Sequence, residues 1–122
     1  MSTAPQPSAI PQPPTQPEAI RAALAQVAPH LIADFDRDRA AGTARARAEV
    51  SAVPLRTFTQ AWAVEVAIAR HPEVAARLRA LEARAGEVTD LGEARDIAAE
   101  ISRIRNTAAA EAGIRTAGGA AR

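Results

Sequence analysis

The sequence predicts an all-α protein, a small antiparallel bundle of four to five helices. Apolar residues recur at steps of three and four along most of the chain, which is the period of an amphipathic helix. Prolines and glycines divide the chain into segments of helical length. The sequence has no alternating run of β-branched residues and no Asn-Gly turn, the usual signals of strands and hairpins. We expect one helical domain over residues 18–113.

The start of the chain is rich in proline. Residues 1–17 contain six of the nine prolines, and each proline fixes φ and removes a backbone N–H. This composition predicts a disordered, partly polyproline II arm, which favours a solubilising tail over a ligand for an aromatic groove. A second short disordered tail is expected over residues 114–122.

Two helices are predicted between the arm and the middle of the chain. Residues 18–28 form the first, with its apolar side chains on one face. Pro29 suits the first position of the second helix, which weakens near Gly42 because glycine is a poor helix former. Residues 45–50 either continue this helix or form a separate turn.

The next two predicted helices supply most of the expected core. Pro54 opens a helix over residues 55–70, and Pro72 begins another that ends at Gly86. The apolar side of the first carries Leu55, Phe58, Trp62, Val66 and Ala69. The apolar side of the second carries Val74, Leu78, Leu81 and Ala85.

The longest predicted helix is amphipathic and covers residues 90–112. Its apolar stripe consists of Leu91, Ala94, Ile97, Ala98, Ile101, Ile104 and Ala108. Asp90 is expected to cap its start, with Glu93 reaching back in a capping box, and Gly113 is expected to end it in a left-handed conformation. A stripe of this length has to be buried, either against the rest of this chain or against a second protein.

Composition excludes several classes of protein. All 15 basic residues are arginine and they face 14 acidic residues, so the net charge of +1 does not indicate a general nucleic-acid binder. The absence of cysteine excludes disulfides and thiolate metal sites. No apolar run approaches the roughly 18 residues of a membrane span. The start also lacks a basic region followed by an apolar stretch, so we expect a cytoplasmic protein with no membrane partner.

One acidic run has the outline of a metal site. Residues 34–38, Asp-Phe-Asp-Arg-Asp, match the spacing of the first three ligands of a calcium loop, but Arg39 replaces the glycine that the loop requires. On a helix, His30, Asp34 and Asp38 would share one face. A solvated acidic face explains these residues better than a metal site, so no metal is predicted.

Catalytic signatures are missing from the sequence. No glycine-framed serine is present, and Gly118 and Gly119 are not followed by a helix as a phosphate-binding loop requires. We therefore expect no catalytic residues, no cofactor and no small-molecule substrate.

Binding of nucleic acid is a less favoured function, and it would use Arg45, Arg47 and Arg56. Residues 47–62 have the outline of a helix-turn-helix, with residues 52–54 as the turn, but the usual turn glycine is absent. Arginines that solvate an amphipathic surface explain the same pattern more simply.

Part of the chain resembles a known family. The segments that carry the resemblance are the acidic run at 34–38, the Ala/Arg-rich stretch 40–49, Val53-Pro54-Leu55, and the helix centred on Trp62 that ends in Ala67-Ile68-Ala69. Over residues 18–72 they are similar to a family of small helical proteins from high-GC Gram-positive bacteria. Some members of that family resemble antitoxins encoded beside small toxins that cleave messenger RNA. The resemblance implies a helical fold and a protein partner, although this chain has Ala63 where the family frequently has a second tryptophan.

These observations predict a non-enzymatic protein-interaction module, antitoxin-like in character, that binds its partner through the C-terminal helix. The residues expected to contact the partner are Leu91, Ile97, Ile101 and Ile104 in a groove, with Glu93, Asp96 and Glu100 against a basic surface. The alternative is a self-associating structural bundle, a homo-oligomer that has no client protein.

Overall fold

The computed structural model describes residues 10–114 of the chain, and every regular element in that range is helical. The elements are α1 (Pro17–Val27), the 3-10 turn η1 (Pro29–Leu31), α2 (Ile32–Glu49), α3 (Val53–Ala69), α4 (Pro72–Ala85) and α5 (Leu91–Glu111). The predicted all-α class is confirmed, with five α-helices and no strand in this range. Residues 1–9 of the expected arm and 115–122 of the expected tail lie outside the described residues.

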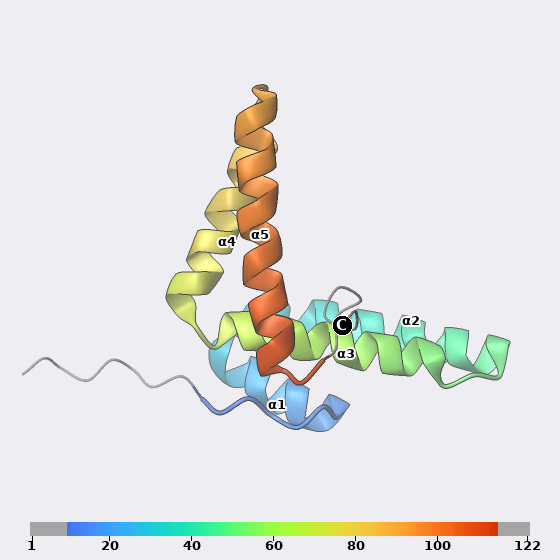
Figure 1. The fold of residues 1–122 in the computed structure, drawn as a ribbon. Helices are drawn as coiled ribbons and strands as arrows, with labels where there is room; N and C mark the ends of the chain where they lie inside the picture. Colours follow the sequence, from blue (N-terminus) through green and yellow to red (C-terminus); the bar gives the residue numbers. More distant parts are fainter. Residues whose placement is uncertain (1–9, 115–122) are drawn as a thin grey trace, which may run out of the picture.

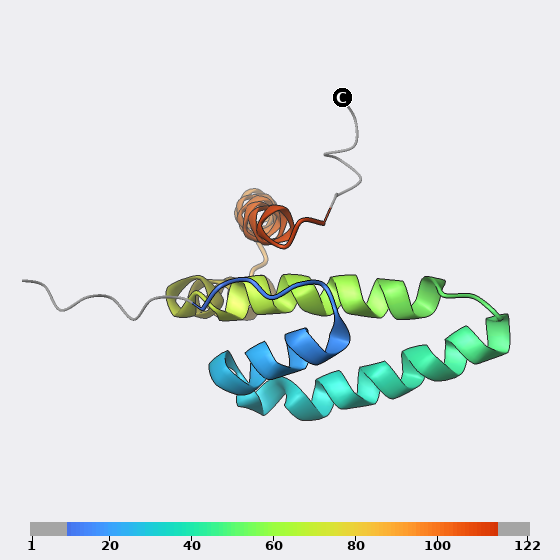
Figure 2. The same ribbon diagram turned by 90° about the horizontal axis from the view of Figure 1, so that it is seen from below.

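The helices form an L rather than one parallel stack. Helices α1 and α2 pack along one side of α3, and α4 and α5 form a hairpin that rises from its other side (Figures 1 and 2). Helix α3 contacts all four of the other helices. One arm of the L is the α2–α3 hairpin, and the other arm is the α4–α5 hairpin.

An aromatic cluster joins α2 to α3. The ring centroid of Phe35 lies 5.0 Å from that of Phe58 and 5.5 Å from that of Trp62, which it meets edge to face. Trp62 is 8% exposed, and its indole Nε1 donates a hydrogen bond to Asp38 Oδ2 at 3.2 Å. The core positions predicted for Phe58 and Trp62 are confirmed, and part of the acidic run serves this core.

The other side of α3 is crossed by the end of α5 through small side chains. Ala63 and Ala67 on α3 and Ala108 and Ala112 on α5 are buried in the same core cluster. Each pair is spaced four residues apart and so lies on one helical face. The distance between two packed helices depends on the side chains between them. Alanines on both helices therefore allow α5 to lie close to α3.

Helix boundaries follow the proline and glycine positions. Prolines occupy the first turn of α1, α3 and α4, where the missing N–H has no intrahelical partner to lose. Helix α2 does not break at Gly42 but continues to Glu49, so residues 45–49 are helical. Gly42 is buried against α3, and a Cβ atom placed there would lie 3.6 Å from Phe58 Cβ.

Helix α5 has the predicted start, with one difference. The Asp90 carboxylate accepts a hydrogen bond from the Glu93 backbone N–H at 2.8 Å. The Glu93 side chain does not complete a capping box, because it binds the guanidinium of Arg84. At the other end, Gly113 adopts the expected positive φ, 75°.

The part of the proline-rich start that the structure describes is ordered, which corrects the prediction of disorder for residues 10–16. This strap lies along α3. Gln12 Nε2 donates to the Ala63 carbonyl at 3.0 Å, and Arg70 Nη1 donates to the Ile10 carbonyl at 2.9 Å. The Ile10 side chain also packs against the core. The composition did not predict the strap, because hydrogen bonds from the side chains of Gln12 and Arg70 hold it, and not the regular backbone hydrogen bonds of a helix or a sheet.

Replacing Trp62 with alanine is expected to lower the free energy of unfolding by about 3–5 kcal/mol, because the change removes a buried ring and leaves a cavity. Urea denaturation followed by circular dichroism measures this change. Gln60→Ala, an exposed position on the same helix, is the control and is expected to stay within about 0.5 kcal/mol of the native chain. An unchanged unfolding free energy for Trp62→Ala would contradict the aromatic core.

Candidate functional site

The apolar stripe of α5, predicted to bind a partner, is packed within this chain. Ile97 is 7% exposed, and Ile101 and Ile104 pack against the core formed by the other helices. Leu91 is the exception, with 65% of its surface exposed at the start of the helix. Ile97 is thus buried within the chain, whereas Ile101 and Ile104 are only partly buried, and Ile104 lines a hollow between α3, α4 and α5. Contact of these residues with a partner stays a prediction.

Two of the three predicted acidic contacts are also occupied within the chain. Glu100 receives two hydrogen bonds of 2.8 Å from Arg77, and Glu93 receives bonds of 2.8 and 2.9 Å from Arg84. These guanidinium groups hold the pKa values of the Glu100 and Glu93 carboxyls below their ordinary value. Asp96 is exposed and has no ion pair with any residue in the described range.

The residues considered for a metal are used in structural contacts or lie apart. Asp34 binds Arg37 at 2.8 Å, Asp38 accepts a hydrogen bond from the Trp62 indole, and His30 is an exposed residue of η1. Within residues 10–114 no group of three or more His, Cys, Asp or Glu side chains is placed to hold a metal ion.

The three arginines considered for nucleic acid lie toward the far end of the α2–α3 arm. Arg45 and Arg47 are in the last turns of α2, Arg56 is in the first turn of α3, and all three are exposed. Arg45 also forms an ion pair of 3.3 Å with Glu49. Arg56 lies about 200° around α3 from the buried Pro54, so it faces away from α2. The arginines therefore share an end of the molecule rather than one face that could contact nucleic acid.

In the described part of the chain, no helix is long and apolar enough to cross a membrane.

A groove lies at the elbow of the L and is the larger of two hollows there, with a volume of about 440 Å³. We call it the elbow groove. Its apolar lining is Val27, Ala28, Leu31, Ile68, Ala69, Pro72, Ala75 and Leu78. Its polar lining is His30, Glu65, Arg79, Glu82 and Arg105. These residues come from α1, η1, α3, α4 and α5 and from the links between them, so the groove exists only when both hairpins are docked.

A network of two ion pairs that share Arg105 forms part of the rim of the elbow groove. Arg105 on α5 lies 3.1 Å from the Glu65 carboxylate on α3 and 3.5 Å from the Glu82 carboxylate on α4. Arg79 stands on the same rim, exposed and without an ion pair to any described residue. The rim therefore presents both signs of charge above an apolar floor, and Arg79 is its unpaired cation.

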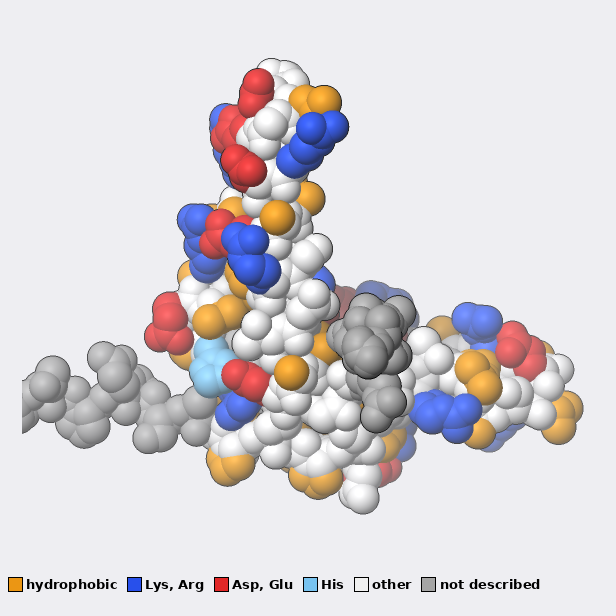
Figure 3. Space-filling view, in the orientation of Figure 1, with side chains coloured by type: hydrophobic (Ala, Val, Ile, Leu, Met, Phe, Trp, Pro, Cys, Tyr) orange, Lys and Arg blue, Asp and Glu red, His pale blue; other side chains and the backbone are white. Residues whose placement is uncertain are grey.

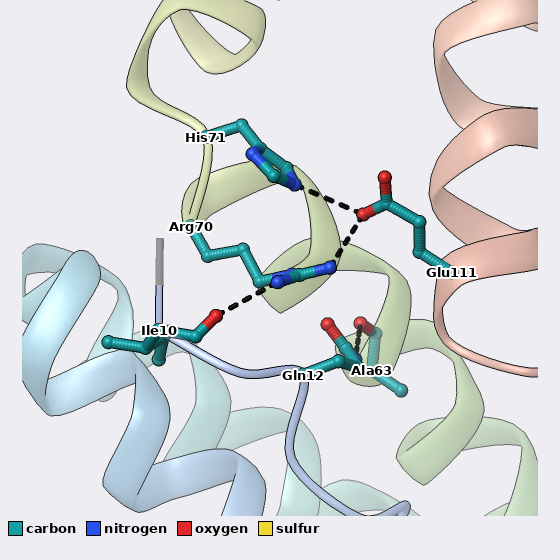
Figure 4. A network of polar contacts seen from close by, with 6 residues as sticks. All are labelled: Ile10, Gln12, Ala63, Arg70, His71 and Glu111. Atoms are coloured by element: carbon teal, nitrogen blue, oxygen red, sulfur yellow. Dashed lines mark hydrogen bonds and ion pairs between the residues drawn. The ribbon is translucent and has the colours of Figure 1, made fainter. Parts of the chain in front are cut away.

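The second hollow, of about 320 Å³, lies between α3, α4 and α5 and has polar groups that bind one another. Glu111 on α5 accepts from Arg70 Nη2 at 2.9 Å, and the same oxygen lies 3.1 Å from His71 Nε2 (Figure 4). Arg70 also holds the strap through the Ile10 carbonyl. Because this network clamps three segments of the chain together, we assign it a structural role.

No family model, no curated protein and no solved structure matches this chain. The resemblance to small helical, antitoxin-like proteins therefore stays a prediction.

Sequence patterns did not single out the elbow groove. Its lining extends from Val27 to Arg105, so no local spacing brings it to attention. The only local signal is Pro29, which turns the chain between α1 and α2 and places Val27 and Leu31 beside α3 and α4.

Arg77→Gln is expected to raise the pKa of the Glu100 carboxyl toward its ordinary value of 4.5, because it removes the guanidinium that stabilises the charged form. The lowered pKa of Glu100 in the native chain adds stability that is present above the unfolded-state pKa and is lost as the pH falls through the folded-state pKa. The variant should show less of this acid-dependent loss. NMR titration of the carboxyl carbon measures the pKa.

Arg95→Gln is the control, since Arg95 is exposed on the same helix as Glu100 and has no ion pair with a described residue. It should leave the Glu100 pKa unchanged. If Arg77→Gln also left it unchanged, the Arg77–Glu100 pair would not exist in solution.

Proposed function

We propose that this chain is a non-enzymatic protein-interaction module whose docking surface is the elbow groove. The observation that carries the proposal is the combination of an apolar floor with a charged rim at the junction of two hairpins. Binding sites concentrate in clefts between structural units, where apolar contacts supply affinity and a few polar groups supply orientation. The groove has both components.

The occupant that fits best is an amphipathic helix of a second protein. Such a helix inserts apolar anchors spaced three and four residues apart into a groove and meets the rim with its charged edge. Leu31 and Leu78 offer apolar contact from opposite sides of the elbow groove, and Arg79 offers an unpaired positive charge to an acidic residue of the partner. An acidic residue beside the apolar anchors is therefore part of the proposed ligand.

Two observations support a protein as the partner rather than a substrate or a nucleic acid. The sequence has no glycine-framed serine or phosphate-binding loop. Arg45, Arg47 and Arg56 do not share a face that would track a phosphate backbone. The resemblance to antitoxin-like proteins is consistent with a steric role, in which this chain binds and covers part of a small partner encoded nearby. Under this proposal α5 stays packed against α3 and α4 and contributes Arg105 to the lining of the elbow groove. It does not leave the fold to bind the partner.

Ala75→Asp tests the proposal, because it places a charge on the apolar floor of the elbow groove. We expect at least a tenfold loss of affinity for the partner, since burying an unpaired carboxylate against apolar surface is unfavourable. The chain is co-expressed with the protein of its neighbouring gene, and light scattering then gives the mass of the purified complex. Titration calorimetry on the separated proteins measures the affinity.

Ala76→Asp is the matched control, with the same substitution one residue later, on an exposed position outside the groove. It should bind like the native chain, and circular dichroism should show both variants to be helical. Equal affinity of the two variants, or the absence of any complex with the native chain, would contradict the proposal.

A further inference from the structure

The two arms of the L end in hydrophobic side chains that are exposed to solvent. Among the described residues the exposed large hydrophobic side chains are Val50 at 91%, Val53 at 52% and Leu91 at 65%. Val50 and Val53 lie at the end of the α2–α3 arm, and Leu91 lies at the end of the α4–α5 arm (Figure 1). Among the described residues, the large hydrophobic side chains that are exposed thus lie at the ends of the two arms.

The two ends carry opposite charge. Residues 44–57, here called the basic tip, contain three arginines and one glutamate, a net charge of +2. Residues 84–96, the acidic tip, contain four acidic residues and two arginines, a net charge of −2. Charged side chains lie near orange hydrophobic ones at both ends in Figure 3.

Part of the charge at each tip is not used within the chain. At the basic tip, Arg47 and Arg56 are exposed and make no ion pair with any residue from 10 to 114. At the acidic tip the same holds for Glu87 and Asp96. The acidic tip also contains Arg95, which is exposed and makes no ion pair with a described residue. The basic tip therefore offers two free arginines, and the acidic tip offers two free acidic residues against one free arginine, each beside an exposed apolar side chain.

The basic tip also keeps an unfavourable backbone conformation. Val50 has φ 51° and ψ 54°, the left-handed region in which a β-branched residue is a rare outlier. A glycine would relieve this strain and would also end α2 well. The turn is held by a hydrogen bond from the Val53 N–H to Ser51 Oγ at 3.1 Å. Such strain at an exposed site points to a role for the side chain outside the fold itself.

We propose that two copies of this chain form a closed dimer, in which the basic tip of each copy contacts the acidic tip of the other. The two tips of one copy cannot meet, because the arms diverge from the elbow (Figure 1). A second L rotated by 180° about an axis normal to the plane of the first brings each tip opposite the complementary tip. This two-fold arrangement satisfies both contacts at once and leaves no tip unpaired.

The proposed contacts are small and charged, which determines how the dimer behaves. Each contact joins a few side chains, far less than a large obligate interface, so the dimer dissociates on dilution. Because the contacts are exposed to solvent, salt screens them. The dimer is therefore expected at high protein concentration and low salt, with a mass twice the 12.7 kDa of the chain.

Charge reversal tests the proposal with the full chain. Arg47→Glu with Arg56→Glu makes both tips acidic, and Glu87→Arg with Asp96→Arg makes both tips basic. Each variant alone should be monomeric, because like charges then face each other in both contacts. An equimolar mixture of the two should form a heterodimer, because both contacts again join opposite charges. Sedimentation velocity in low and high salt measures the masses.

Arg79→Glu with Arg103→Glu is the control, since it changes the net charge by the same amount at exposed positions along the α4–α5 arm. It should dimerise like the native chain. Val50→Gly is a second test variant. It should raise the melting temperature, because glycine relieves the strain at this positive φ. It should also weaken the dimer at least about threefold, because it removes exposed apolar surface.

Four results would each overturn the proposal. They are a native chain that stays monomeric at millimolar concentration in low salt, a dimer that survives reversal of the basic tip, a mixture of the two reversal variants that does not associate, and chains longer than a dimer. The Ala75→Asp comparison addresses the elbow groove separately, so failure of the dimer does not bear on partner binding.

Discussion

The fold depends on the burial of α3 on two sides. Its sequence places aromatic and aliphatic side chains around most of its circumference, and eight of its 17 residues are buried. A helix that is apolar around most of its surface has to lie inside the protein. One side of α3 is covered by α1 and α2 through the cluster of Phe35, Phe58 and Trp62, and the other is covered by the end of α5 through alanines. The L shape follows from these two coverings.

The α4–α5 hairpin meets the rest of the molecule mainly at its base, so its outer part has to be stable as a pair of helices. Leu81 of α4 and Ile97 of α5 are buried, and neither belongs to the core cluster around α3. Ion pairs span the seam from Arg77 to Glu100, from Arg84 to Glu93 and from Arg105 to Glu82. Exposed pairs of this kind each contribute little to stability, but they favour one alignment of the helices over others. The same side chains that looked like a partner surface in the sequence thus fix the register of the hairpin.

Local rules predicted the helices and their limits, because prolines and glycines act on neighbouring residues only. Pro54, Pro72 and Asp90 marked helix starts in the sequence and do so in the structure. The features that local rules missed depend on contacts between distant residues. The strap needs Arg70 and Ala63 to hold residues 10–16, and the elbow groove needs Val27 and Arg105 to meet. The stripe on α5 was visible in the sequence, but whether it packs in cis depends on the small residues Ala63 and Ala67 of α3, which the stripe itself does not reveal.

The clamp at Arg70 has a consequence for the order in which the chain can fold during its synthesis. Arg70 joins the Ile10 carbonyl near the start of the chain to Glu111 in the last turn of α5. Helices α1, α2 and α3 have their mutual contacts within a short stretch of sequence, so they can assemble as soon as residue 69 has left the ribosome. The carboxylate that completes the clamp arrives some 40 residues later. Until then one face of α3 stays uncovered, and the nascent protein carries an exposed alanine surface that only its own final turns can close.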